Sequence, residues 1–235
     1  MKNIYISGTS SGLGNYLLKN IKKSKKFYRN KKNKIKDNSI LIHNAFFKKK
    51  NNESKSEFNT NNKITINLYN KIKTYNFKII VLISTIDLYQ NNHPKNSYIF
   101  LKKKLEKEIK KQKKFYIFRC GLLIGKSMSR NSFFKLIKAK TKTHISLSKK
   151  SSMYLTSYKD VLKGIKAIIK KSNIKCGIYN VVSAEKFYFD NVKNENIIFG
   201  NYKLSYKKIS NLKFEKNFKL KTETNSQLIR KTLQI

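Results

Sequence analysis

Residues 3–21 read NIYISGTSSGLGNYLLKNI, and this stretch decides the fold. A short apolar run ends at Gly8, and Leu13, Leu17 and Ile21 follow at helical spacing. The pattern therefore predicts a strand, a glycine loop and a helix in succession. Glycines at such a junction permit a tight turn and let the backbone N–H groups at the helix N-terminus approach an anion.

The rest of the chain continues this alternation of short strands and amphipathic helices. Residues 78–83 are predicted to form a strand, because the five residues that follow Lys78 are all apolar, as expected for a strand buried on both faces of a parallel sheet. Further strands are predicted at 27–29, 39–43, 115–118 and 177–182, helices at 63–75, beyond Pro94, at 160–171 and from about residue 222, and a polar loop at 48–62. This order indicates an α/β fold with a doubly wound parallel sheet of the Rossmann type.

Positive charge dominates the composition. Of 235 residues, 54 are Lys or Arg and 12 are Asp or Glu, so the formal net charge is +42. The lysines are spread along the whole chain and only four basic residues are Arg, whereas nucleic-acid recognition favours the guanidinium. We therefore expect no specific nucleic-acid partner, although a polyanion- or RNA-binding protein on a Rossmann scaffold stays open as an alternative.

Several other classes are disfavoured by what the sequence lacks. The two cysteines, Cys120 and Cys176, and the three histidines stand at no ligand-like spacing, so we expect neither a metal site nor a disulfide framework. The sequence has no run of about 18 apolar residues, so we expect no membrane-spanning helix. A cytoplasmic protein is the resulting expectation.

The glycine loop has the spacing G-x-x-x-G-x-G, which suits a pyrophosphate at the helix N-terminus. The alternative is a glycine-rich turn without a ligand. Arg29 follows the predicted second strand, where proteins that prefer NAD place an acidic residue on the ribose 2′-hydroxyl. A guanidinium there suits a 2′-phosphate and favours NADP, unless Arg29 is simply a solvated surface charge.

Together these residues resemble the short-chain dehydrogenase/reductase superfamily. The glycine loop is similar to that of its shorter-chain members, while later segments look more like the extended branch of NAD(P)-dependent epimerases, dehydratases and reductases of nucleotide sugars. Residues 40–45 resemble the strand end with His-x-Ala that lines the cofactor, and residues 81–89 resemble the strand and turn with the active-site hydroxyl. Tyr98 and Lys102 match the Tyr-x-x-x-Lys pair.

The resemblance runs in order from Lys2 to about Ser183. Residues 118–121 are similar to the family's Arg-Pro turn, with Cys in place of Pro, and 159–161 and 177–181 match two later landmarks. Position carries the argument for Tyr98 and Lys102, because three Tyr-x-x-x-Lys pairs occur and chance alone predicts about three.

The resemblance implies four catalytic residues. Tyr98 would exchange a proton with the substrate oxygen, Thr85 would orient that oxygen, and Asn61 would complete a proton relay. Lys102, one helical turn after Tyr98, would hold the nicotinamide ribose and lower the pKa of the phenol electrostatically. The residues expected to bind the cofactor are Gly8, Ser10, Ser11, Gly12, Leu13, Gly14, Arg29, Asn44, Ala45 and Lys102.

The implied activity is that of an NAD(P)-dependent reductase or epimerase acting on a sugar attached to a nucleotide, in surface-polysaccharide synthesis, with NADP as cofactor and NAD also possible. Reduction of a keto-sugar is preferred to epimerisation. A dehydratase is disfavoured, because Ile86 and Asp87 replace the Asp-Glu pair of that class. A catalytically idle, cofactor-binding regulator of the same fold stays open.

The expected organisation is a cofactor-binding domain followed by a small lobe. We assign residues 1–183 to an NAD(P)-binding Rossmann-type domain, with 126–156 contributing to the substrate cleft, and residues 184–235 to a C-terminal substrate lobe. The resemblance also implies a possible homodimer.

Overall fold

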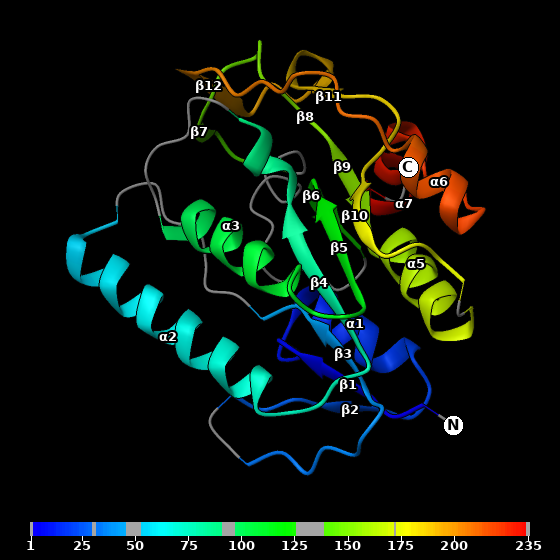
Figure 1. Cartoon of the computed structure of the whole chain (residues 1–235). Coiled ribbons are helices and arrows are strands. Elements are labelled where there is room, and N and C mark those ends of the chain that lie inside the picture. The colour runs from blue at the N-terminus through cyan, green and yellow to red at the C-terminus, as the bar shows by residue number, and fades with distance from the viewer. Residues whose placement is uncertain are drawn as a thin grey trace.

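The structure, a computed structural model, describes residues 2–29, 32–45, 53–90, 97–125, 139–171 and 173–233. A parallel sheet of six strands runs through its centre in the order β10-β5-β4-β3-β1-β2 (Figure 1). The strands are β1 (Ile4–Ser7), β2 (Ser24–Lys26), β3 (Ile40–His43), β4 (Ile79–Thr85), β5 (Phe115–Cys120) and β10 (Gly177–Val181). The prediction of a parallel Rossmann-type sheet is confirmed.

Helices cover both faces of this sheet (Figure 1). One face carries α2 (Lys55–Lys73) and α3 (Ser97–Ile109), and the other carries α1 (Gly12–Asn20), α5 (Tyr158–Lys170) and α6 (Leu212–Phe218). The strands supply alternate residues to the two apolar layers, as a period of two requires. Along β3, for example, Leu41 packs toward α2 and α3, while Ile40 and Ile42 pack toward α1 and α5.

The direction of winding reverses between β1 and β3. From β1 the chain passes first to β2 on one side, and then back across to β3 on the other. Ligands of open α/β sheets bind outside the carboxyl ends of the strands at such a switch point. The residues that follow Ser7 and His43, the last residues of β1 and β3, are therefore candidates for a ligand site.

Several boundaries differ from the predictions. Helix α2 begins at Lys55, inside the predicted polar loop, because Ser54 and Glu57 form a reciprocal capping box that starts the helix early. The second strand lies at 24–26 rather than 27–29, and Phe27, just after it, is a core residue. The rest of that predicted loop, residues 48–52, lies outside the described residues.

Short elements complete the chain. Three two-stranded pairs were not predicted, and they are formed by β6 (Leu122–Ile124) with β9 (Leu155–Ser157), β7 (Thr143–Leu147) with β12 (Ile197–Tyr202), and β8 (Ser152–Met153) with β11 (Phe187–Tyr188). Two 3-10 turns span Ile86–Tyr89 and Phe189–Asn191. Helix α7 (Asn225–Leu233) corresponds to the predicted terminal helix.

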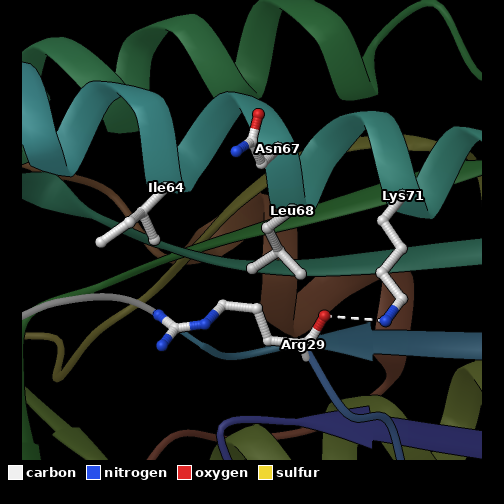
Figure 2. Close-up of a pocket in the computed structure, with 5 residues that line it drawn as sticks. All are labelled: Arg29, Ile64, Asn67, Leu68 and Lys71. Atoms are coloured by element: carbon white, nitrogen blue, oxygen red, sulfur yellow. Dashed lines mark hydrogen bonds between the residues drawn. The ribbon is translucent and has the colours of Figure 1, made fainter. Parts of the chain in front are cut away.

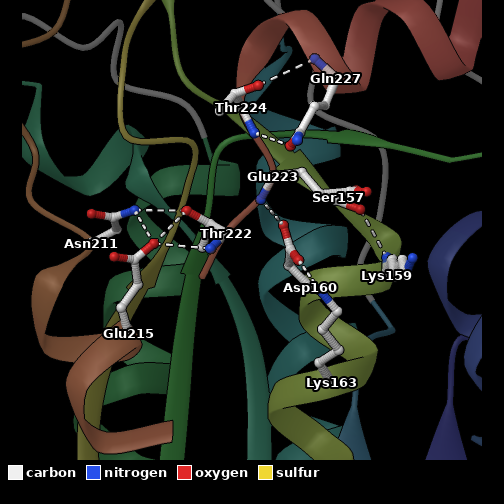
Figure 3. Close-up of polar contacts among 10 residues, drawn as sticks. All are labelled: Ser157, Lys159, Asp160, Lys163, Asn211, Glu215, Thr222, Glu223, Thr224 and Gln227. Atoms are coloured by element: carbon white, nitrogen blue, oxygen red, sulfur yellow. Dashed lines mark hydrogen bonds and ion pairs between the residues drawn. The ribbon is translucent and has the colours of Figure 1, made fainter. Parts of the chain in front are cut away.

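Polar contacts fasten the C-terminal segment to α5 (Figure 3). The backbone N–H of Glu223 donates to Asp160 at 2.8 Å, and Lys163 pairs with the same carboxylate at 3.3 Å. Nearby, Glu215 of α6 accepts from the backbone and the hydroxyl of Thr222. These bonds bring residues 211–223 back to the sheet. Within the described ranges, no helix has the length and apolarity needed to cross a membrane.

Candidate active site

The glycine loop is pressed against the residues that follow β3. Gly8 has φ +70°, and a Cβ atom on it would lie 2.8 Å from the backbone of Ala45. A Cβ on Gly14 would lie 1.9 Å from the carbonyl oxygen of Gly8 and 2.9 Å from the side chain of Asn44. Only hydrogen fits at these two positions, so the predicted loop and the predicted Asn44–Ala45 segment meet at the switch point.

Ser7 and His43, the last residues of β1 and β3, hold the Asn44–Ala45 segment in place beside the glycine loop. The Ser7 oxygen accepts the backbone N–H groups of Asn44 and Ala45 at 3.1 and 3.2 Å. Both of its lone pairs are then used, so its proton is donated to Nδ1 of His43, 2.8 Å away. The neutral imidazole therefore carries its proton on Nε2.

His43 is kept neutral by its surroundings. It is 2% exposed, and burial, together with the charge of Lys102, lowers its pKa to about 3. In the unfolded chain a histidine takes up a proton near pH 6.5. Protonation therefore favours the unfolded chain as the pH falls from about 6.5 toward 3, and the folded protein loses stability over that window.

His43→Asn is expected to remove this part of the pH dependence. Between pH 7 and pH 5 the free energy of unfolding of the wild-type protein should fall by about 2 kcal/mol more than that of the variant. The amide can still accept the Ser7 proton, so the comparison isolates titration. Urea unfolding at the two pH values measures it, and parallel curves for the two proteins would show that His43 titrates normally.

The N-terminus of α1 offers donors to an anion. The N-cap residue Ser11 makes no side-chain hydrogen bond to the helix, so it does not use the backbone N–H groups of the first turn. Among the described residues, a Cβ on Gly12 would approach the hydroxyl of Tyr158 alone, at 3.2 Å. Ser10 and Leu13, on either side of this turn, complete the predicted set of loop and helix residues, which we call the cradle. Backbone N–H groups at a helix N-terminus are the donors that an anion requires.

Thr85, Tyr98 and Lys102 converge at the carboxyl edge of the sheet. Thr85 is the last residue of β4, and its side chain is hydrogen-bonded to the phenol of Tyr98 in the first turn of α3. The ammonium of Lys102 lies 5.8 Å from the centre of the Tyr98 ring and donates to the carbonyl of Ile83 at 2.7 Å. The charge of Lys102 also lowers the pKa of His43, so these three residues lie close enough to the end of β3 to influence it electrostatically.

The electrostatics of Tyr98 differ from the expectation. Burial raises the pKa of Tyr98, the carboxylate of Asp87 raises it further, and the hydrogen bond with Thr85 opposes the rise. The predicted lowering by Lys102 is therefore wrong in direction, because desolvation dominates. Burial also lowers the pKa of Lys102 to about 8, with Cys120 and Glu106 opposing, so its amine is mostly charged at neutral pH.

Asp87 and Tyr206 complete the surroundings of Tyr98, and no local pattern in the sequence predicts either role. The backbone N–H of Asp87 donates to the Thr85 oxygen at 3.1 Å. Its carboxylate accepts the Tyr206 hydroxyl at 2.5 Å, across 119 residues of chain. Tyr206 thus attaches the segment after β12 directly to the turn that follows Thr85.

Ser84, the neighbouring hydroxyl, points into a different network. It donates to Glu106 at 2.6 Å, and Glu106 forms a two-pronged ion pair with Arg119 at 2.7 and 3.1 Å. Adjacent residues of a strand face opposite sides, so only one of the two hydroxyls can meet Tyr98. The structure puts Thr85 there, and Thr85 is the hydroxyl residue that the family resemblance implies.

Asn61 lies near the start of α3 but has other described contacts. Its side-chain amide donates to Glu53 at 2.6 Å and to the Ser97 hydroxyl at 3.4 Å. Glu53 in turn accepts the backbone N–H of Ser97 at 2.8 Å, at the beginning of the helix. The described bonds of Asn61 therefore position α3 beside Tyr98, and its part in a proton relay stays a prediction.

Arg29 lines a pocket of about 410 Å³ between the end of β2 and helix α2 (Figure 2). Its guanidinium extends along α2 toward Ile64, with Leu68 beside it, and its carbonyl accepts the ammonium of Lys71 at 2.7 Å. This pocket lies on the β2 side of the switch point. Elsewhere in the described ranges, no group of three or more His, Cys, Asp or Glu residues could hold a metal ion.

Comparison with known proteins gives a fold but no sequence relative. No protein-family model matches the chain, and no curated protein matches it significantly. UDP-glucuronic acid 4-epimerase from Bacillus cereus, in complex with UDP-glucuronic acid and NAD, matches with a TM-score of 0.79 at 15% identity, over 100% of this chain and 98% of that chain.

Two other solved structures give the same result. RMD from Pseudomonas aeruginosa, complexed with NADPH, matches with a TM-score of 0.72 at 15% identity, over 100% of this chain and 98% of that one. The dTDP-glucose 4,6-dehydratase from Bacillus anthracis, in complex with NAD, matches with a TM-score of 0.74 at 15% identity, over 100% and 96%. At these identities the shared feature is the fold.

Proposed function

We propose that the protein is an NAD(P)-dependent oxidoreductase or epimerase of the extended short-chain dehydrogenase/reductase type, acting on a nucleotide-linked sugar. One observation carries the proposal. Thr85, Tyr98 and Lys102 meet at the carboxyl edge of the sheet whose switch point holds a glycine cradle for a pyrophosphate. The three matched structures bear a nicotinamide cofactor in this fold, and their names refer to nucleotide sugars in two cases.

The chain's own residues have distinct tasks in this proposal. The turn from Gly8 to Gly14 and the start of α1 would bind the pyrophosphate, with Asn44 and Ala45 beside it. A bound nicotinamide would supply or accept the hydride. Tyr98 holds the proton to be exchanged with the sugar oxygen, and Thr85 fixes the direction of that phenol. Lys102 stands charged beneath the Tyr98 ring.

A second candidate is a cofactor-binding protein without turnover. Its support is the pKa of Tyr98, which is raised rather than lowered, and the bond that occupies Lys102 at the Ile83 carbonyl. Both functions predict binding of NADPH or NADH, which the fluorescence of the reduced nicotinamide measures. They differ in turnover. Oxidation of NADPH with 4-keto-sugar nucleotides, followed at 340 nm, tests reduction, and NMR of UDP- and dTDP-sugars after incubation tests epimerisation.

We assign a preference for NADPH over NADH to Arg29. In our proposal its guanidinium binds the 2′-phosphate, and Ile64 and Leu68 line the space for the adenosine end. Arg29→Ala should therefore weaken binding of NADPH about ten-fold and leave binding of NADH within two-fold. Lys25→Ala, which removes an exposed charge from the neighbouring strand β2, is the matched control. Equal losses for both cofactors would remove Arg29 from this role.

A further inference from the structure

Tyr158, the first residue of α5, reaches the N-terminus of α1. The residue is 5% exposed, and its hydroxyl lies 3.2 Å from the position that a Cβ on Gly12 would occupy. The backbone N–H of Leu13 hydrogen-bonds to the phenol oxygen. A side chain from a distant helix thus lies against the first turn of α1, in contact with Gly12 and Leu13.

Two segments pack against the ring of Tyr158. A Cβ on Gly125 would come within 2.2 Å of the ring, so the chain after β6 packs directly on it. The ring of Tyr16 lies 5.6 Å away, between centroids, at a tilt of 45°. The phenol is therefore a fixed part of the cradle, since swinging it outward would require both walls to move.

The chemistry of the hydroxyl makes it a donor toward the cradle. Its oxygen accepts the Leu13 N–H, which leaves the O–H proton to be donated. Burial raises the pKa of Tyr158, with the Leu13 N–H opposing, so the proton stays on the oxygen at neutral pH. An N–H bond accepted by the oxygen also strengthens its O–H as a donor.

We propose that Tyr158 is a phosphate-binding residue of the cofactor site, whose hydroxyl donates to the pyrophosphate of the dinucleotide and extends the N-terminus of α1 toward it. This inference rests on the proposed function. It adds a residue from α5, outside the glycine loop, to the groups that recognise the cofactor. The pyrophosphate is the anionic acceptor expected in front of this helix, and its contact with a phenol would be a strong, charge-assisted hydrogen bond.

Tyr158→Phe tests the inference, because it removes the hydroxyl and keeps the ring between its two walls. The dissociation constants of NADPH and of ADP-ribose, measured by calorimetry, should both rise at least about ten-fold. Binding of adenosine, which has no phosphate, should be unchanged. Tyr16→Phe is the matched control, since Tyr16 touches the same ring but has no described contact with the helix N-terminus, and its effect should stay within two-fold.

The outcomes separate this inference from the proposed function. If the wild-type protein binds neither NADPH, NADH nor ADP-ribose, both fail. If the wild-type protein binds them and Tyr158→Phe binds them equally well or more tightly, the hydroxyl only caps the helix or obstructs the cradle, and this inference alone is overturned. The thermal midpoint of the variant without ligand shows whether it is folded, and a folded Tyr158→Phe with weakened ADP-ribose and unchanged adenosine supports the assignment.

Discussion

Tyr98→Phe is expected to lower the turnover number about a thousand-fold on any sugar nucleotide that the wild-type protein converts. The variant keeps the ring, its packing and the neighbouring charge of Lys102, and it loses only the oxygen that exchanges a proton. Thr85 is hydrogen-bonded to that oxygen, and its aliphatic hydroxyl is a much weaker acid than the phenol, so it does not replace Tyr98 as a proton donor. Steady-state kinetics with saturating cofactor measure the loss.

A second tyrosine provides an unusually close control. Tyr69 and Lys73 on α2 have the same spacing, and the lysine ammonium lies 5.5 Å from the ring centre, against 5.8 Å for Lys102 and Tyr98. The Tyr69 hydroxyl donates to the carbonyl of Glu108, at the end of α3 opposite to Tyr98. Tyr69→Phe should therefore retain turnover. Undiminished turnover in Tyr98→Phe would remove the phenol from the mechanism.

The strands of the sheet could be predicted where a short apolar run is followed by glycine or polar residues. The strand predicted at 78–83 could be recognised without knowing its neighbours, because residues 79–83 are all apolar, as a strand buried on both faces requires. The start of α2 was missed for a local reason. Its first half is rich in polar residues and its apolar stripe begins late, so the helix is set by the cap at Ser54 and Glu57 rather than by periodicity.

The small paired strands were missed for a different reason. Strands such as β7 and β12 lie about 50 residues apart and pair through backbone bonds, with exposed and half-buried residues mixed along them. No local sequence pattern predicts such a pairing. The same holds for α6, whose buried side chains, Phe214 and Phe218, become core only because β5 and α5 present Phe118 and Gly164 to them.

The candidate site also contains residues that the sequence predicts and residues that only tertiary packing brings to it. Gly8, Asn44 and Thr85 could be found from the sequence because each directly follows or ends a strand, and parallel strands bring their carboxyl ends together. Tyr158 and Tyr206 could not be found, since packing of α5 and of the C-terminal segment brings them to the site. The pKa of Tyr98 escaped for the same reason, because burial depends on what the rest of the chain places around the phenol.

Of the substitutions considered, Gly14→Ala is expected to lower the free energy of unfolding most. The new methyl group would lie 1.9 Å from the Gly8 carbonyl oxygen, a backbone atom that cannot turn aside as a flexible side chain can. Either the loop or the first turn of α1 must move by more than an ångström, away from Asn44 as well. Overpacking against backbone of this severity costs about 3 kcal/mol or more, so the thermal midpoint should fall by about 6–12 °C.

The same displacement should weaken NADPH binding more than ten-fold, because the N–H groups of the cradle would no longer point to one place. Asn15→Ala is the matched control, since it adds helix propensity one residue further along α1 and should leave both the midpoint and the affinity close to those of the wild-type protein. The two readouts test separate steps. A lower midpoint with unchanged affinity would mean that the loop is needed for folding but not for the cofactor, and a wild-type midpoint would contradict the close approach of Gly14 to Gly8 on which the whole cradle depends.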